Sequence, residues 1–174
     1  DLSDPGNAET YAANYDTFAG RIDVLDAALR AATETLPADA RKLVTYHDAY
    51  AYFARTYGWK VVGAIQPSSF EEPTPKEIAD LIDQVKSENV KAVFGSEVFP
   101  SPVLEQIGNE AGVTYVDELR DDDLLGEPGD PEHSWMGLMR FDYVTMIEAL
   151  GGDASALKAL DVSNISDDKA SYPQ

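Results

Sequence analysis

Residues 42–65, KLVTYHDAYAYFARTYGWKVVGAI, decide the fold of this chain. The apolar run at residues 42–46 predicts a strand, and residues 47–58 predict a helix that ends at Gly58. A second strand is predicted over residues 59–65. A strand, a helix and another strand in so short a stretch indicate a βαβ unit, in which the two strands run parallel.

The alternation continues downstream of a loop at residues 67–73. Thr74-Pro75-Lys76-Glu77 predicts a helix start, in which Thr74 is the N-cap and Glu77 completes a capping box. Two more strands are predicted, at residues 91–95 and 113–117. The helix between them is predicted to begin at Ser101-Pro102.

The last predicted helix follows an acidic loop rich in Gly and Pro, at residues 118–130. Asp130-Pro131 predicts its start, and it is expected to reach about Leu150. On this helix His133 is expected at the surface. Three apolar residues at helical spacing are expected in the core: Trp135, Met136 and Met139.

A long amphipathic helix precedes the first strand. Its apolar residues recur at steps of three and four: Tyr11, Tyr15, Phe18, Ile22, Leu25, Leu29 and Leu36. We therefore expect an α/β fold, with a four-stranded parallel sheet flanked by helices and preceded by a long linker helix. The expected division is a linker helix at 1–37, an α/β lobe at 38–152, and a tail at 153–174 that packs on the lobe or is loosely ordered.

Composition excludes several classes of function. The chain has 174 residues and a net charge of −19, from 32 acidic and 13 basic residues. Nucleic acid is therefore not expected as a partner, because binding phosphates needs a basic patch. The absence of Cys removes thiolate metal sites and disulfides together. No phosphate-binding glycine motif and no nucleophile elbow is present, which argues against the corresponding enzymes.

Candidate ligands fall where the predicted strands end. His47 follows the first strand, Glu97 the third, and Asp121-Asp122-Asp123 the fourth by a few residues. Ligands of open parallel sheets bind at this edge, and imidazole with carboxylates suits Zn²⁺ or Mn²⁺. Each residue also has a structural interpretation: a capping His, a Glu that supports a turn, and a solvated acidic loop.

Five segments resemble one known family, in register from about residue 4 to Leu150. They are residues 7–15 (NAETYAANY), 42–58 (KLVTYHDAYAYFARTYG), 72–82 (EPTPKEIADLI), 90–97 (VKAVFGSE), and 123–140, which contains DLLGEPG and WMGLMR. The family is that of zinc- or manganese-binding solute-binding proteins of ABC importers, and the chain resembles their C-terminal lobe with its preceding linker helix.

The resemblance implies two lobes joined by one rigid helix, with a metal between them held by four ligands. Carried over, the ligands from this lobe are His47 and Asp123. Counting forward from His47 favours Asp122, whereas counting back from Pro128-Gly129 favours Asp123, which we choose. A His at position 47 leans towards Zn²⁺, with Mn²⁺ as the alternative.

Several further expectations follow from the resemblance. The chain is expected to be a C-terminal fragment that lacks the N-terminal lobe and two ligands, and so to bind metal weakly or not at all by itself. The intact protein would be extracytoplasmic, either periplasmic or lipid-anchored, would deliver metal to an ABC permease and would not be an enzyme. A homodimer of the fragment is also considered. The alternatives are a flavodoxin-like small-molecule enzyme and an adhesion or partner-binding domain.

Overall fold

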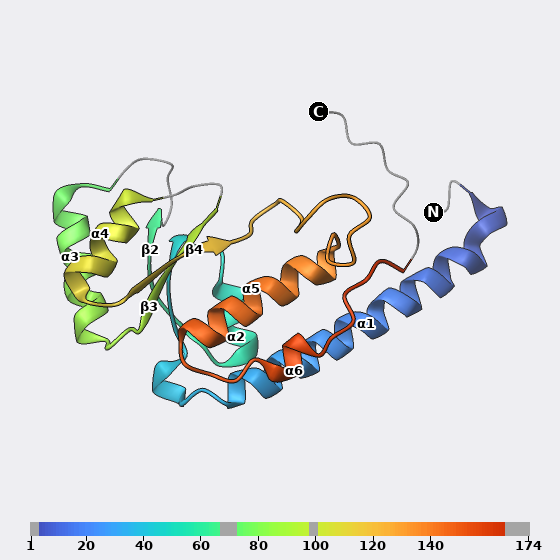
Figure 1. Cartoon of the computed structure of the whole chain (residues 1–174), viewed down its shortest axis with the longest axis horizontal. Helices are drawn as coiled ribbons and strands as arrows, with labels where there is room; N and C mark the ends of the chain where they lie inside the picture. Colours follow the sequence, from blue (N-terminus) through green and yellow to red (C-terminus); the bar gives the residue numbers. More distant parts are fainter. Residues whose placement is uncertain (1–3, 67–72, 98–100, 166–174) are drawn as a thin grey trace.

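The central sheet contains four parallel strands: β1 (Lys42–His47), β2 (Lys60–Gln66), β3 (Ala92–Ser96) and β4 (Thr114–Leu119). Their order across the sheet is β2-β1-β3-β4 (Figure 1). The computed structural model describes residues 4–66, 73–97 and 101–165. The predicted four-stranded parallel α/β fold is confirmed, and so is the long helix in front of it.

Helices cover both faces of this sheet (Figure 1). The α-helices are α1 (Ala8–Glu34), α2 (Ala51–Tyr57), α3 (Pro75–Ser87), α4 (Pro102–Ala111), α5 (Trp135–Ala149) and α6 (Ser155–Lys158), and short 3₁₀ turns lie at Pro5–Asn7 and Ala38–Ala40. Helices α3 and α4 pack on one face, whereas α2, α5 and the second half of α1 pack on the other. The connection through α2 places β2 on one side of β1. The connections through α3 and α4 then place β3 and β4 on the other side of β1.

Successive strand residues point to opposite faces and so form two cores. Leu43 and Phe94 belong to the core with α1, α2 and α5. Their sequence neighbours Val44 and Val93 belong to the core with α3 and α4. All four side chains are almost fully buried. The two central strands are therefore apolar on both faces, as expected for a parallel sheet covered by helices on each side.

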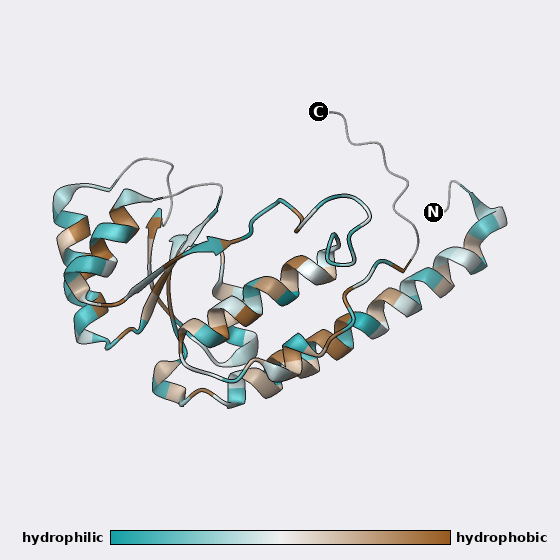
Figure 2. Ribbon diagram, in the orientation of Figure 1, coloured by the Kyte–Doolittle hydropathy of each residue, from teal (hydrophilic) through white to brown (hydrophobic). Residues whose placement is uncertain are grey.

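The long helix α1 contributes to the core only with its second half. Leu25 and Leu29 are buried against α5 and the segment that contains α6, and Figure 2 shows hydrophobic residues concentrated along this part of α1. The first half of α1 extends beyond the body of the molecule (Figure 1). Tyr15 lies on this half and is 72% exposed.

Two helices begin later than the sequence predicts. Helix α2 begins at Ala51 rather than at His47, because β1 continues to His47, which still pairs with Gln66 of β2. Helix α5 begins at Trp135 rather than at Asp130-Pro131. The Asp130 carboxylate instead accepts the Glu127 N–H at 3.0 Å and closes a turn within the acidic loop.

Ser134 is the actual N-cap of α5, and its hydroxyl accepts the Gly137 N–H at 2.9 Å. His133 therefore precedes the helix and is half-buried, which corrects the expectation of a surface residue in the first helical turn. Trp135 is 41% exposed, so its assignment to the core is wrong, whereas Met136 is buried and Met139 half-buried. The indole of Trp135 meets the ring of Phe18 edge to face, with centroids 5.6 Å apart.

The other predicted helix starts are confirmed. The Thr74 hydroxyl accepts the Glu77 N–H at 3.3 Å and the Glu77 carboxylate accepts the Thr74 N–H at 2.7 Å, so the capping box at α3 is complete. At α4 the Ser101 hydroxyl caps the helix by accepting the Leu104 N–H at 3.2 Å. The predicted loop at 67–73 falls outside the described residues except for Pro73. The predicted division of the chain into a linker helix (1–37), a lobe (38–152) and a tail (153–174) stays a prediction.

Candidate functional site

The sheet changes direction of winding between β1 and β3, and a small pocket lies at their carboxyl ends. Ligands of open α/β sheets bind at this kind of switch point, because the loops after the two strands separate there. The pocket has a volume of about 100 Å³. It is lined by residues at the end of β1 and just after it, at the end of β3, and at the end of β4 and just after it: Thr45, Tyr46, His47, Ala49, Tyr50, Phe94, Gly95, Ser96, Leu119 and Asp121.

His47 is the last residue of β1 and lines this pocket. Its side chain is half-buried, and its ring meets that of Tyr46 edge to face with centroids 4.7 Å apart. The Thr45 hydroxyl donates to the carbonyl of His47 at 2.7 Å. Strand pairing and this hydrogen bond fix the backbone that carries the imidazole, so its position at the pocket is set by the sheet.

The three consecutive aspartates lie in the loop that follows β4. All three are exposed, and Asp121 lines the same pocket as His47. Asp122 and Asp123 follow it in the chain and are not among the pocket-lining residues. The structure therefore brings His47 and the start of the acidic run together. The choice of Asp123, with Asp122 as the alternate, stays a prediction.

Glu97 follows β3 and contacts the start of the acidic loop. Its backbone N–H donates to the Leu119 carbonyl at 3.1 Å, and its carboxylate lies 3.8 Å from the Arg120 guanidinium. Among the residues that the structure describes, neither of its buried carboxylate oxygens has a hydrogen-bond partner. Burial raises the pKa of Glu97, and the charges of Asp121 and Asp123 raise it further against the opposing effect of Arg120.

Asp142 on α5 is a buried carboxylate behind this loop, and sequence reasoning missed it. It is 8% exposed, and its Oδ1 accepts the backbone N–H of Arg120 at 2.9 Å. Burial raises the pKa of Asp142 to about 7, even though the Arg120 N–H lowers it. The available signal was an acidic residue between two aromatic residues, Phe141 and Tyr143, on a helix expected to pack in the core.

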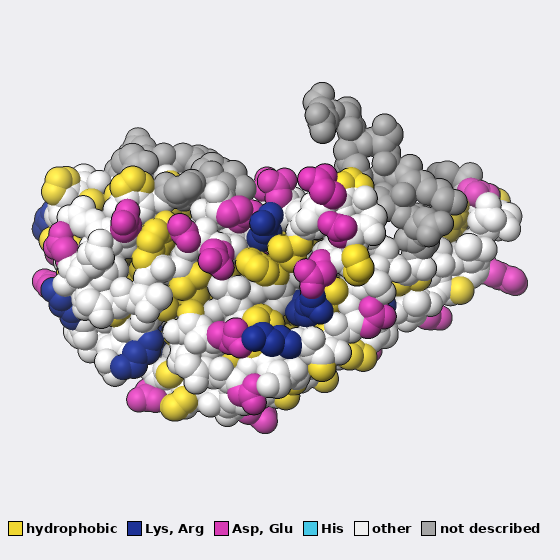
Figure 3. All heavy atoms as spheres, in the orientation of Figure 1, with side chains coloured by type: hydrophobic (Ala, Val, Ile, Leu, Met, Phe, Trp, Pro, Cys, Tyr) yellow, Lys and Arg dark blue, Asp and Glu magenta, His cyan; other side chains and the backbone are white. Residues whose placement is uncertain are grey.

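Any metal site built from the described residues alone would be incomplete. Within residues 4–66, 73–97 and 101–165, no three His, Asp or Glu side chains are grouped closely enough to hold an ion together. One imidazole beside a set of exposed carboxylates can contribute two ligands, whereas a closed zinc site usually has four. Acidic side chains are spread over the face that carries the loop after β4, with few basic ones among them (Figure 3).

None of the helices in the described residues is both long enough and apolar enough to cross a membrane. Comparison with protein families matches residues 2–149 to the family described as zinc-uptake complex component A, periplasmic. This match covers the sheet, the acidic loop and all of α5.

Curated relatives have related names. The iron-binding protein YfeA of Yersinia pestis is 31% identical over 148 residues, which are 85% of this chain and 47% of YfeA. The manganese-binding lipoprotein MntA of Halalkalibacterium halodurans is 29% identical over 84% of this chain and 49% of its own length. The zinc-binding protein TroA of Treponema pallidum is 27% identical, again over 84% and 49%. The chain thus spans about half the length of these relatives.

Solved structures show the same fold. The periplasmic zinc-binding protein TroA of Treponema pallidum superposes with a TM-score of 0.72 at 27% identity, over 84% of this chain and 54% of TroA. A manganese-bound periplasmic metal-binding protein of Candidatus Liberibacter asiaticus gives a TM-score of 0.72 at 24% identity, over the same shares of the two chains. The fold described above therefore corresponds to about half of each of these proteins.

Proposed function

Because this chain belongs to the family of periplasmic zinc-uptake component A proteins, we propose that it is the C-terminal half of an extracytoplasmic receptor that captures Zn²⁺ for an ABC importer. Mn²⁺ is the alternative cargo. The observation that carries the proposal is the pocket at the switch point, where His47 lies beside the acidic loop. Members of this family are transport proteins that bind their substrate, so the proposal needs no chemical step, and an enzyme is disfavoured.

Two ligands are proposed from this chain: the imidazole of His47 and the carboxylate of Asp123, or of Asp122 in its place. A borderline-soft nitrogen and a charged oxygen form a suitable half-site for Zn²⁺. Imidazole favours zinc over manganese, which supports zinc as the first choice. The printed names of the relatives include zinc, manganese and iron, so the family by itself does not decide the metal.

An exposed apolar stripe on α1 supports the proposal that another lobe of the intact protein packs against this helix. Tyr11, Tyr15, Phe18 and Ile22 continue the stripe on which Leu25 and Leu29 are buried, yet all four are more than a third exposed. Large exposed apolar stripes commonly mark an interface. The matched stretch covers only about half of each relative, and we propose that an N-terminal half of the intact protein covers this stripe and supplies two further ligands. A second copy of the fragment is the alternative occupant.

The location and the partner of the intact protein are part of the same proposal. Its relatives are named as periplasmic proteins or lipoproteins, and one is named as a substrate-binding lipoprotein of an iron ABC transporter. An extracytoplasmic receptor, periplasmic or lipid-anchored, would release its ion to the permease. The net charge of −19 also favours cation capture, because it raises the local concentration of cations.

Zinc calorimetry on the full open reading frame tests the proposal. We expect tight 1:1 binding that falls at least about tenfold in His47→Ala and in Asp123→Ala or Asp122→Ala. Asp83→Ala is the matched control, since Asp83 is exposed on α3 and lies outside the pocket lining, and it should bind as the wild type does. The 174-residue chain alone should bind only weakly. Equal zinc affinity in all variants would show that neither His47 nor the aspartates are metal ligands.

A further inference from the structure

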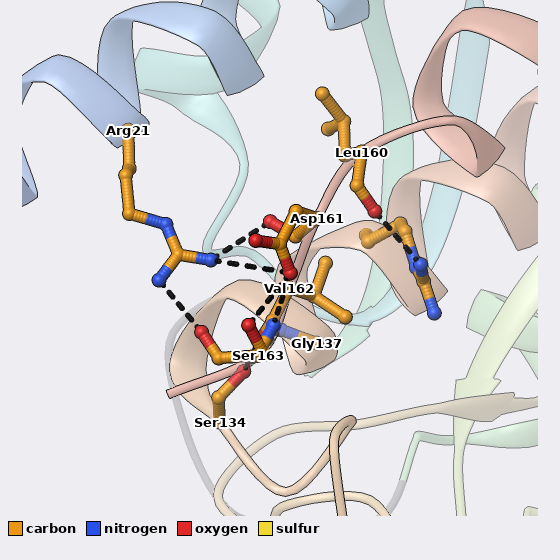
Figure 4. Close-up of polar contacts among 8 residues, drawn as sticks. Arg21, Ser134, Gly137, Leu160, Asp161, Val162 and Ser163 are labelled. Atoms are coloured by element: carbon orange, nitrogen blue, oxygen red, sulfur yellow. Dashed lines mark hydrogen bonds and ion pairs between the residues drawn. The ribbon is translucent and has the colours of Figure 1, made fainter. Parts of the chain in front are cut away.

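Residues 160–164 form an extended segment, here called the C-terminal strap, that lies beyond the stretch matched by the family. In the described part of the chain no strand pairs with it, so its backbone carbonyls need other donors. Each of four consecutive carbonyls accepts a hydrogen bond from a side chain (Figure 4). The donors come from α1 and from the start of α5.

Arg21 of α1 provides two of these hydrogen bonds. Its guanidinium donates to the carbonyl of Asp161 at 2.8 Å and to that of Ser163 at 2.6 Å, and it lies 4.0 Å from the Asp161 carboxylate (Figure 4). The Arg21 side chain is only 21% exposed. The planar guanidinium presents several N–H donors in fixed directions, so a single residue can hold two carbonyls in register.

The strap is also joined to the start of α5. The Ser134 hydroxyl donates to the Val162 carbonyl while it accepts the N–H of Gly137, so one residue caps the helix and holds the strap. Arg140 donates to the Leu160 carbonyl at 3.1 Å. The side chain of Val162 is itself buried in the core with α1 and α5.

A short chain of contacts leads from the strap into the acidic loop. The Asn164 side-chain amide donates to the His133 carbonyl at 2.9 Å. Nδ1 of His133 lies 3.0 Å from the carbonyl of Leu125, which is two residues after Asp123. The middle of the loop is therefore held through His133, whereas its start is held by the hydrogen bond between Arg120 and Asp142.

We propose that the strap holds the acidic loop in the geometry needed for metal capture, with Arg21 and Asn164 as positioning residues. The inference rests on the proposed function, because the loop carries the carboxylate assigned to the metal. Groups that orient a ligand without touching the ion commonly change metal affinity when they are removed. Neither Arg21 nor Asn164 lines the pocket at the switch point.

Two measurements on matched variants test this. Hydrogen exchange is followed in the metal-free 174-residue chain at residues 120–134, which include most of the acidic loop and the residues up to α5. Zinc affinity is measured on the protein encoded by the full open reading frame, by competition with a chromophoric chelator. The variants are Arg21→Ala, Arg21→Lys and Asn164→Ala, which removes one exposed side-chain contact and should fold normally. Arg55→Ala is the control, because Arg55 lies on α2 over the ring of Tyr52.

The expected result is faster exchange of the loop and a zinc Kd about tenfold higher in Arg21→Ala, with a smaller rise in Asn164→Ala. Arg21→Lys should recover part of the affinity, because an ammonium can still donate to one of the carbonyls. Faster exchange with unchanged zinc affinity would reduce the strap to a purely structural role and overturn the inference alone. Equal effects of Arg55→Ala and Arg21→Ala would overturn it in the same way. A wild-type protein that does not bind zinc would overturn the proposed function, and this inference with it.

Discussion

The backbone N–H of Arg120 donates to Oδ1 of Asp142 at 2.9 Å, and this bond fixes the first residue after β4 to the middle of α5. The acidic loop therefore starts from a backbone position set by a buried carboxylate. Burial is the main cause of the raised pKa of Asp142, about 7, and the nearby charges of Glu97 and Asp121 add to it. A carboxylate retained at such a position destabilises the folded chain when it ionises.

Asp142→Asn should stabilise the metal-free chain at alkaline pH. Between pH 3.8 and about 7 the folded chain keeps a proton that the unfolded chain has lost, so the free energy of unfolding falls as the pH rises through this window. Asn keeps the acceptor for the Arg120 N–H and cannot ionise. The gain should be near zero at pH 4 and up to about 4 kcal/mol above pH 7, because one pKa unit is worth about 1.4 kcal/mol.

Urea unfolding in a chelator from pH 4 to 8 measures this gain. Asp83→Asn, on the exposed side of α3, is the control and should change stability little at any pH. An Asp142→Asn gain that does not vary with pH would show that Asp142 stays ionised in the folded chain.

Gly137→Ala should destabilise the chain by about 2 kcal/mol or more, because overpacking a tight contact forces the backbone to move. A Cβ at this position would lie 2.1 Å from the carbonyl oxygen of Glu132, in the segment just before α5. Gly20→Ala is the matched helical control. In the described part of the chain no atom lies within 4 Å of a Cβ at this position, so the substitution should stabilise α1 by about 0.5–1 kcal/mol. Opposite signs in denaturant unfolding are expected, and a neutral Gly137→Ala would contradict the close approach.

Thr74→Ala should lower the free energy of unfolding by about 1 kcal/mol, because it removes the side chain that caps α3. Glu77→Gln preserves the capping box and should cost less. Thermal or urea unfolding of the two variants measures the difference. Zinc affinity should stay constant in both, since α3 lies on the face opposite α5. Reduced affinity would indicate that the pocket depends on both faces of the sheet.

Tyr15→Glu should weaken self-association of the 174-residue chain. Tyr15 is the most exposed member of the apolar stripe on α1, and a carboxylate there opposes burial of the stripe against any partner. Tyr52→Glu on α2 is the control, since Tyr52 is similarly exposed but lies away from the stripe. Sedimentation velocity over a range of concentrations separates the two. Equal self-association of the wild type, Tyr15→Glu and Tyr52→Glu would show that the stripe is not the interface.

Periodicity predicted the fold well because each strand and helix carries its own apolar pattern. The βαβ order and the capping box at Thr74 depend on residues close in sequence, and both are confirmed. The predicted start of α5 was wrong because Asp130 and Ser134 are both residue types that are favoured as N-caps. Which of the two residues caps the helix depends on contacts that are distant in sequence, since Ser134 also donates to the carbonyl of Val162 in the strap.

The candidate site was predicted only in part for a similar reason. The rule that ligands bind at strand ends pointed to the edge where the structure has a pocket, and His47 and Asp121 line that pocket. Asp142 is in the middle of a helix, where a carboxylate usually faces water. Its burial and its bond to Arg120 depend on how α5 packs behind β4, and no local pattern reports that packing.

The most direct test of the proposed half-site uses the two histidines of this chain as reporters. Imidazole ¹⁵N signals are recorded by NMR on the ¹⁵N-labelled chain while Zn²⁺ is added, with His133→Gln used to assign the two sets. We expect zinc to shift the ring signals of His47 and to leave those of His133 in place, and this effect should be lost when Asp122 and Asp123 are both changed to Ala. Zinc-induced shifts confined to His133, or shifts at His47 that persist without both aspartates, would contradict the proposed half-site.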